Sequence, residues 1–128
     1  MVSIKKRIEI DVFKSELCGY LIRGDGKIIC QEKLNANLSE CDLVKDVVWL
    51  INTLILRSSG YKFDIAGVNI SCLGKVDENR GIVQAEEFGI KNLALADSVS
   101  DSVGLYVKVT ESKKKTEGRD EAEAVALF

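Results

Sequence analysis

The apolar residues of this chain change their spacing near Ser39, and this change constrains the fold more than any other feature. Ile8, Ile10 and Val12 alternate with charged residues, which is the period of a strand with one buried face. From Leu43 to Leu56 the apolar residues instead recur every three or four positions, as on a helix that packs broadly against a sheet. The two periods together predict an α/β fold.

The rest of the pattern gives the order of the elements. A hairpin turn at Gly24-Asp25-Gly26, where both glycines tolerate a positive φ, joins two strands that follow the first. The helix begins after Ser39 and ends before Ser58. An irregular turn is expected from Gly74 to Gly81. Strands are predicted over 17–22, 27–34, 65–71, 82–85 and 105–109, and further helices on Leu93, Ala96, Val99 and Val103 and over 118–128.

These elements predict a single domain over residues 1–128. Its centre is a mixed five-stranded sheet with an antiparallel three-strand meander, and the helices pack on that sheet. A content of 46% hydrophobic residues is enough to bury a core of this kind.

The absence of histidine excludes several classes of enzyme chemistry. A chain without histidine has no Ser-His-Asp triad, no Cys-His nucleophile pair and no H-E-x-x-H zinc site. A net charge of −2 argues against a nucleic-acid groove, which needs a clustered basic face. The one basic run, Lys113 to Lys115, lies among acidic residues, so we expect a solvated loop there rather than an anion site.

The cysteines predict neither a metal site nor disulfides. Cys18, Cys30, Cys41 and Cys72 include no C-x-x-C pair, and three of them lie in strand-like segments. We expect small buried hydrophobic residues in a reducing cytoplasm. The longest apolar stretch, within 47–56, contains Asn52 and Thr53 and is too short to span a bilayer, so no membrane association is expected.

Four strings of the sequence resemble one family in the same order and spacing. Residues 10–15 (I-D-V-F-K-S) resemble I-D-x-G-G-T, and residues 67–77 resemble G-x-x-x-S-x-P-G-x-V-D. Residues 81–95 resemble G-x-V-x-x-P-N-L-G-W-x-N-x-P-L, and residues 105–112 resemble L-P-V-x-V-E-N-D. The chain thus resembles the ROK family (repressors, open reading frames and kinases). The resemblance implies the N-terminal, ribonuclease H-like lobe of a longer, two-lobed actin-like ATPase.

The resemblance also assigns a remnant of a phosphate loop. Asp11 stands at the metal-associated aspartate of the family, and Ser15 stands at the threonine; for Asp11 the alternative is a polar residue at a strand end. Phe13 and Lys14 replace the paired glycines that let the backbone approach nucleotide phosphates. Lys14 could hold an anion, although a simple exposed lysine is the competing interpretation.

Two further positions bear on catalysis and sugar binding. The family's catalytic aspartate aligns with Ser112, or with Glu111 if the alignment is shifted; a serine with no adjacent base cannot take the proton. The sugar-contacting asparagines align with Glu87 and Glu111. The alternative for Glu86 and Glu87 is a solvated turn.

These departures favour a lobe without catalysis. The first hypothesis is that the chain is the sugar-sensing effector lobe of a ROK-type repressor. Such a lobe needs no cofactor or metal and is expected to form a homo-oligomer. It would reach DNA only through a winged helix, which this chain does not contain. The alternative is a sugar kinase lobe completed by a missing C-terminal lobe. A third hypothesis is a ligand-free dimerisation module, joined through a sheet edge or the apolar helix 43–56.

Overall fold

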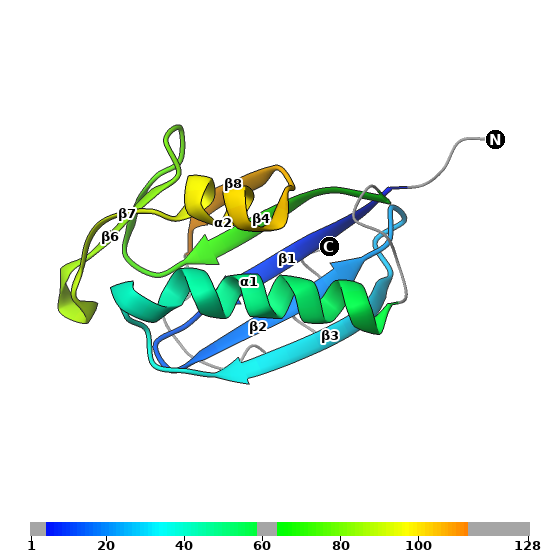
Figure 1. Cartoon of the computed structure of the whole chain (residues 1–128), viewed down its shortest axis with the longest axis horizontal. Helices are drawn as coiled ribbons and strands as arrows, with labels where there is room; N and C mark the ends of the chain where they lie inside the picture. The colour runs from blue at the N-terminus through cyan, green and yellow to red at the C-terminus, as the bar shows by residue number, and fades with distance from the viewer. Residues whose placement is uncertain (1–4, 59–63, 113–128) are drawn as a thin grey trace.

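A five-stranded mixed sheet forms the centre of the molecule in the computed structural model, which describes residues 5–58 and 64–112 (Figure 1). The strand order is β3-β2-β1-β4-β8. The first three strands form the antiparallel meander, and β4 and β8 run parallel to β1. The mixed five-stranded sheet is therefore confirmed. Its strands are β1 (Lys6–Val12), β2 (Glu16–Ile22), β3 (Ile28–Asn35), β4 (Ile65–Cys72) and β8 (Val107–Glu111).

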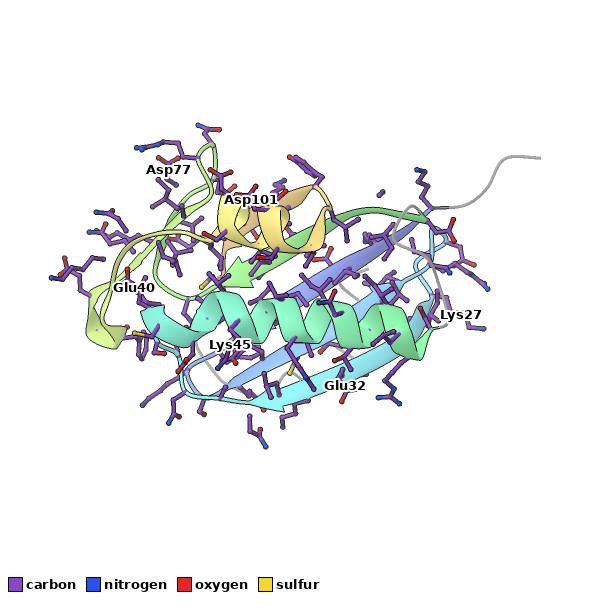
Figure 2. All side chains as sticks on the ribbon, in the orientation of Figure 1. Lys27, Glu32, Glu40, Lys45, Asp77 and Asp101 are labelled. Carbon is purple, nitrogen blue, oxygen red and sulfur yellow. The ribbon has the colours of Figure 1, made fainter. Side chains whose placement is uncertain are left out.

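Two helices of the described chain cover the same face of this sheet, α1 (Glu40–Arg57) and α2 (Leu95–Val103) (Figure 1). Ser39 lies at the N-cap of α1 in an extended conformation, and acidic residues in the first turn complement the positive end of the helix dipole. The helix ends at Arg57, as the sequence predicts. Lys45 of α1 is exposed, and Glu40 lies at the first turn of the helix (Figure 2).

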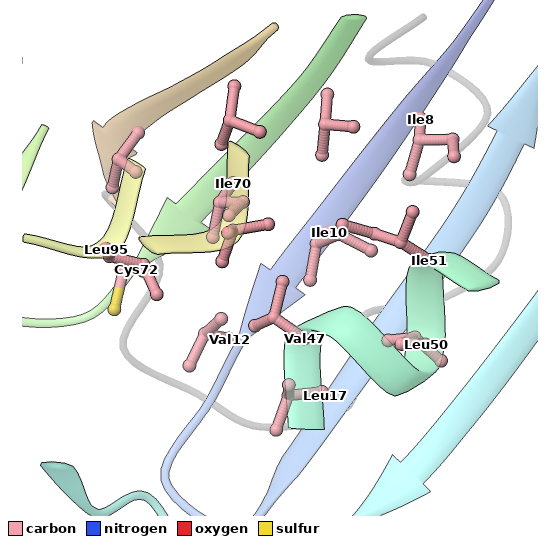
Figure 3. Close-up of a cluster of buried hydrophobic side chains, with 14 of the residues drawn as sticks. Ile8, Ile10, Val12, Leu17, Val47, Leu50, Ile51, Ile70, Cys72 and Leu95 are labelled. Carbon is pink, nitrogen blue, oxygen red and sulfur yellow. The ribbon is translucent and has the colours of Figure 1, made fainter. Parts of the chain in front are cut away.

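The main core lies between α1, α2 and the sheet. Ile8, Ile10 and Val12 of β1 point toward the helices and are almost fully buried, as their alternation predicts (Figure 3). Gly19 of β2 lets α1 approach, because a Cβ at this position would lie 2.9 Å from Leu54 Cδ1. The contributing helix residues are Leu43, Val47, Leu50, Ile51, Leu54, Ile55, Leu95, Ala96, Val99 and Val103.

The apolar stripe of α1 is therefore not available as a dimer contact. The residues from Leu43 to Leu54 that define the stripe pack on the sheet, so they cannot also form the partner surface that the third hypothesis assigned to this helix. Trp49 and Leu56 are its exposed large apolar residues. Strand β3 still lies at an edge of the sheet.

A second, three-stranded antiparallel sheet was not predicted. It contains β5 (Lys75–Asp77), β6 (Ile82–Ala85) and β7 (Ile90–Ala94), with a short 3-10 helix, η2 (Glu86–Phe88), between β6 and β7. Part of the expected irregular turn is thus strand β5.

Two predicted boundaries are also wrong. Helix α2 begins at Leu95, because Leu93 belongs to β7 and pairs with Val83. Leu93 lies three residues before Ala96, so it continues the helical spacing of Ala96, Val99 and Val103 although it belongs to a strand. The last strand lies two residues later than expected and extends to Glu111.

Other sequence predictions have mixed outcomes. Of the two glycines in the β2–β3 turn, Gly26 adopts the positive φ, of 93°. Cys18 and Cys72 are buried, whereas Cys30 is half-buried and Cys41 exposed; all four are free thiols. The helix expected over 118–128 and the basic run 113–115 lie outside the described residues. No helix in the described part of the chain has the length and apolarity needed to cross a membrane.

Gly81 joins the small sheet to α2. Its N–H donates to the carbonyl of Asp77 at 2.7 Å, and its carbonyl accepts from the N–H of Ala96 at 3.2 Å. Its φ is +66°, and a Cβ here would lie 2.3 Å from the Cβ of Ala96. Both backbone conformation and close packing therefore require glycine.

We predict that Gly81→Ala destabilises the protein more than Gly89→Ala. Gly89 has a φ of +74°, but no atom lies within 4 Å of the place that an added methyl group would take, so its replacement costs only the left-handed strain, about 1–2 kcal/mol. At Gly81 overpacking adds about 1–3 kcal/mol. Urea denaturation of both variants measures the difference. Equal losses of unfolding free energy in the two variants would contradict this prediction, because they would mean that α2 moves to accommodate the methyl group at no energetic cost.

Candidate functional site

A cavity of about 620 Å³ lies where the parallel strands β1, β4 and β8 end. In open α/β sheets this carboxyl edge is the usual place for a ligand. Each strand contributes the residues that follow it or end it, and the loop around η2 closes one side. The lining residues are Lys14, Leu73, Gly74, Glu87, Phe88, Glu111 and Ser112.

The turn between β1 and β2 places Lys14 in the cavity wall. The N–H of Phe13 donates to the carbonyl of Glu16 at 2.9 Å, which closes a tight turn. The carbonyl of Lys14 accepts from the N–H of Leu38 at 2.9 Å, so the segment before α1 holds the turn in place. The Lys14 side chain itself is exposed, and among the described residues no carboxylate lies within 4.0 Å of its ammonium group.

Phe13 does not obstruct the cavity, in contrast to the expectation for a side chain in place of a phosphate-loop glycine. Its ring is 1% exposed and packs with Cys18, Tyr20 and Ile22. These residues belong to the sheet face opposite α1, because β2 alternates and Gly19 faces the helix. Of the two glycine replacements, only Lys14 therefore changes the cavity.

The other two residues of the predicted phosphate loop do not line the cavity. Asp11 is buried, 5% exposed, and pairs in register with Cys18 on one side and Ser71 on the other. Its side chain thus belongs to the sheet face opposite the helices. Ser15 is half-buried, and its carbonyl accepts from the N–H of Ala36. Of the three residues, only Lys14 lines the cavity.

Both candidates for the catalytic-base position lie in the cavity wall. The N–H of Ser112 donates to the carbonyl of Cys72 at 2.9 Å, which extends the β4–β8 pairing by one residue. The N–H of Glu111 lies 3.4 Å from a carboxylate oxygen of Glu78. Glu111 is exposed, so its carboxylate is accessible to a ligand.

Glu87 reaches the same cavity from the opposite side. It lies in the 3-10 turn η2, which Gly89 ends with a left-handed conformation and an N–H bond to the carbonyl of Glu86. Glu87 and Glu111 therefore line one cavity, as the motifs suggest, although both are exposed. Glu86 instead borders a neighbouring hollow of about 340 Å³.

Three lining residues were missed by sequence reasoning: Leu73, Gly74 and Phe88. Phe88 occupies the leucine of the third family string, so the alignment itself contained a signal for it. Leu73 and Phe88 give the cavity an apolar surface beside its carboxylates. Such a surface suits the C–H face of a sugar, while carboxylates accept hydrogen bonds from hydroxyl groups.

Cys72 is the last residue of β4 and precedes the cavity residue Leu73, but it does not line the cavity itself. Burial raises the pKa of its thiol to about 12, so the group stays protonated at neutral pH. Its sulfur is therefore neither a nucleophile nor a ligand under ordinary conditions. The residue acts as a small hydrophobic group in the main core.

Solved structures of ROK proteins share this architecture. A ROK family transcriptional regulator, a homologue of the E. coli MLC protein, has a TM-score of 0.72 and 20% identity over 83% of this chain and 27% of its own. A ROK glucokinase from Streptomyces griseus in complex with glucose and AMPPNP has a TM-score of 0.72 and 21% identity, over 83% and 33%. A ROK hexokinase from Thermus thermophilus has a TM-score of 0.71 and 10% identity, over 83% and 35%.

The chain shares the fold of these ROK proteins. This confirms the architecture expected from the four motifs. The chain spans between 27% and 35% of the length of the three proteins. No protein-family model and no curated protein sequence matches it.

We predict that Phe13→Ala and Lys14→Ala have very different effects on stability. Removing a buried aromatic ring costs about 3–5 kcal/mol of unfolding free energy. Removing an exposed lysine changes it by less than about 0.5 kcal/mol. Chemical denaturation of the two neighbouring variants measures both values. A large loss in Lys14→Ala would contradict the exposed position of that side chain.

Proposed function

We propose that this chain is a sugar-sensing effector lobe of a ROK-type regulator and that it does not transfer phosphate. The observation that supports this proposal is the cavity itself, which Glu87 and Glu111 both line, while Lys14 takes the place of a phosphate-loop glycine. The matched regulator, a ROK protein, supports this role by its shared fold. The glucose in the similar glucokinase supports a sugar as the ligand class.

The separation of the phosphate-loop residues supports the absence of catalysis. Asp11 is buried on the far side of the sheet, away from the cavity that Lys14 lines. A metal-associated carboxylate has to reach the metal ion that bridges the phosphates of a nucleotide, and Asp11 is not among the lining residues. Ser112 has a hydroxyl group but no adjacent histidine to act as base.

The regulator we envisage has further parts and an intracellular location. By this proposal the chain is the N-terminal lobe of a two-lobed protein that reaches DNA through a separate winged helix and assembles as a homo-oligomer. Four free thiols, two of them buried, support the reducing environment of a cytoplasm.

One observation favours a sugar kinase lobe as the second candidate. The carboxylate of Glu111 lines the cavity and is a possible general base, if the position shifts by one residue from Ser112. This alternative requires that nucleotide binds with magnesium and that a second lobe completes the site. The two functions therefore differ in their response to ATP.

We predict that the chain binds a neutral sugar and that both cavity carboxylates contribute. Isothermal titration calorimetry with hexoses, pentoses and N-acetylated hexosamines identifies the class. Glu87→Gln and Glu111→Gln should each weaken binding about 10-fold or more, because a hydrogen bond to a charged group contributes about 1.5–3 kcal/mol. Glu86→Gln is the matched control, since Glu86 borders the neighbouring hollow. A response to no sugar, or an equal effect of all three variants, would contradict the proposed site.

We also predict that Lys14→Gly does not create nucleotide binding or phosphoryl transfer. The substitution restores one glycine of the phosphate loop, but Asp11 remains buried away from the cavity. A coupled assay of ADP release, with ATP, magnesium, the bound sugar and a supplied second lobe, measures this in the original chain and the variant. ADP formation in either protein would favour the kinase lobe and identify Glu111 as the candidate base.

A further inference from the structure

Two further hollows adjoin the cavity and continue it along the small sheet. The near hollow has a volume of about 340 Å³ and shares Gly74 and Glu87 with the cavity. The far hollow has a volume of about 550 Å³ and shares Lys75 and Gln84 with the near hollow. The other residues that line the far hollow are Val76, Asp77, Arg80, Ile82 and Asn92. The three spaces therefore form a row with the cavity at one end.

This row follows the hairpin of β5 and β6. Lys75 pairs with Gln84, and Asp77 pairs with Ile82 two residues further along the strand. From Gly74 to Asp77 the chain rises about 10 Å, at about 3.3 Å per residue. The small sheet projects beyond α2 at one end of the molecule (Figure 1). The hollows thus lead outward from the cavity over a length that exceeds the width of one sugar ring.

The small sheet has one buried face and one open face. Val83, Ala85 and Ile90 belong to the main core. Gln84 points away from Val83 and Ala85, because side chains alternate along β6, and it is exposed. Asn92 of β7 is exposed as well, and both amides line the far hollow. The hollows therefore lie on the open face and are accessible to a ligand.

The groups along the row suit a neutral ligand with many hydroxyl groups. Each amide of Gln84 and Asn92 can donate and accept hydrogen bonds, as a sugar hydroxyl also can. Among residues 5–58 and 64–112, neither amide side chain has a hydrogen-bond partner. Both hollows contain charges of both signs, Lys75 with Glu86 in the near one and Lys75 with Asp77 in the far one. This mixture favours neither a strongly anionic nor a strongly cationic ligand.

We propose that the ligand of this chain is an oligosaccharide. Its terminal sugar unit occupies the cavity, the second unit the near hollow and a third unit the far hollow. This inference rests on the proposed sugar-binding function and extends it, because linked sugar units present the same hydroxyl chemistry to each of three adjoining spaces. Gln84 borders both hollows, so it is the residue that distinguishes an oligosaccharide from a monosaccharide.

The test compares saccharides of increasing length by isothermal titration calorimetry with the full chain. The probes are glucose with maltose and maltotriose, glucose with cellobiose and cellotriose, and N-acetylglucosamine with its β-linked dimer and trimer. In at least one series the disaccharide should bind about 10-fold more tightly than its monosaccharide, because each added hydrogen bond contributes about 0.5–1.5 kcal/mol. The trisaccharide should bind more tightly still.

Three variants assign the gain to the hollows. Gln84→Ala should weaken binding of the disaccharide and the trisaccharide about 3–10-fold and leave the monosaccharide unchanged. Asn92→Ala should weaken the trisaccharide alone, because Asn92 borders only the far hollow. Gln31→Ala is the matched control, since Gln31 is also an exposed strand glutamine but lines none of the three spaces. It should leave every affinity unchanged.

The outcomes separate this inference from the proposed function. Binding of a monosaccharide with equal affinities along every series would overturn the oligosaccharide and leave the sugar-binding cavity in place. A tighter disaccharide whose affinity changes equally in Gln84→Ala and Gln31→Ala would overturn the assignment to the hollows. Binding of no saccharide at all would overturn the proposed function together with this inference.

Discussion

The packing of α1 on the three-strand meander is the interaction on which the rest of the structure depends. Gly19 lacks a side chain at the point where Leu50 and Leu54 approach β2, so helix and sheet come into close contact. This contact buries the helix-facing side of β1 and β2 and fixes the segment between β3 and α1. That segment in turn holds the turn of Lys14 through the N–H of Leu38. The packing of the main core therefore determines the position of the cavity wall at the end of β1.

The sequence was sufficient to predict the sheet and α1, because their apolar residues follow a single period. Alternation in Ile8, Ile10 and Val12 and the stripe from Leu43 to Leu54 each indicate one buried face. The strand over 82–85 was predicted correctly, but its sheet was missed because β5 and β7 are short and Leu93 of β7 continues the helical spacing of α2. Side-chain packing across the hairpin, rather than local propensity, determines that region.

The site was predicted only in part, because a motif does not specify the environment of each sheet face toward which its side chains point. Sequence order placed Lys14, Glu87, Glu111 and Ser112 at strand ends and in the loop that meets them, and these four do line one cavity. The alternation in β1 placed Asp11 on the face opposite Ile10 and Val12, but the motif could not indicate that this face is buried or that Phe13 packs into it. A side chain's face depends on the strand register, and β1 directs Asp11 away from the helices. Residues adjacent in a motif can thus lie on opposite sides of the protein.

Phe13 and Lys14 are linked by one peptide bond, yet one is buried on the sheet face opposite the helices, the back face, and the other belongs to the cavity wall. The turn that contains them has little freedom, because backbone hydrogen bonds to Glu16 and Leu38 hold it on both sides. A rotation of this turn that exposed the ring would also displace the ammonium group. The position of the ammonium group therefore depends on the burial of the ring, although the exposed lysine itself contributes little to stability. A change at Phe13 can therefore reach the cavity through the turn, whereas a change at Lys14 alters the cavity and leaves the packing of the back face as it is.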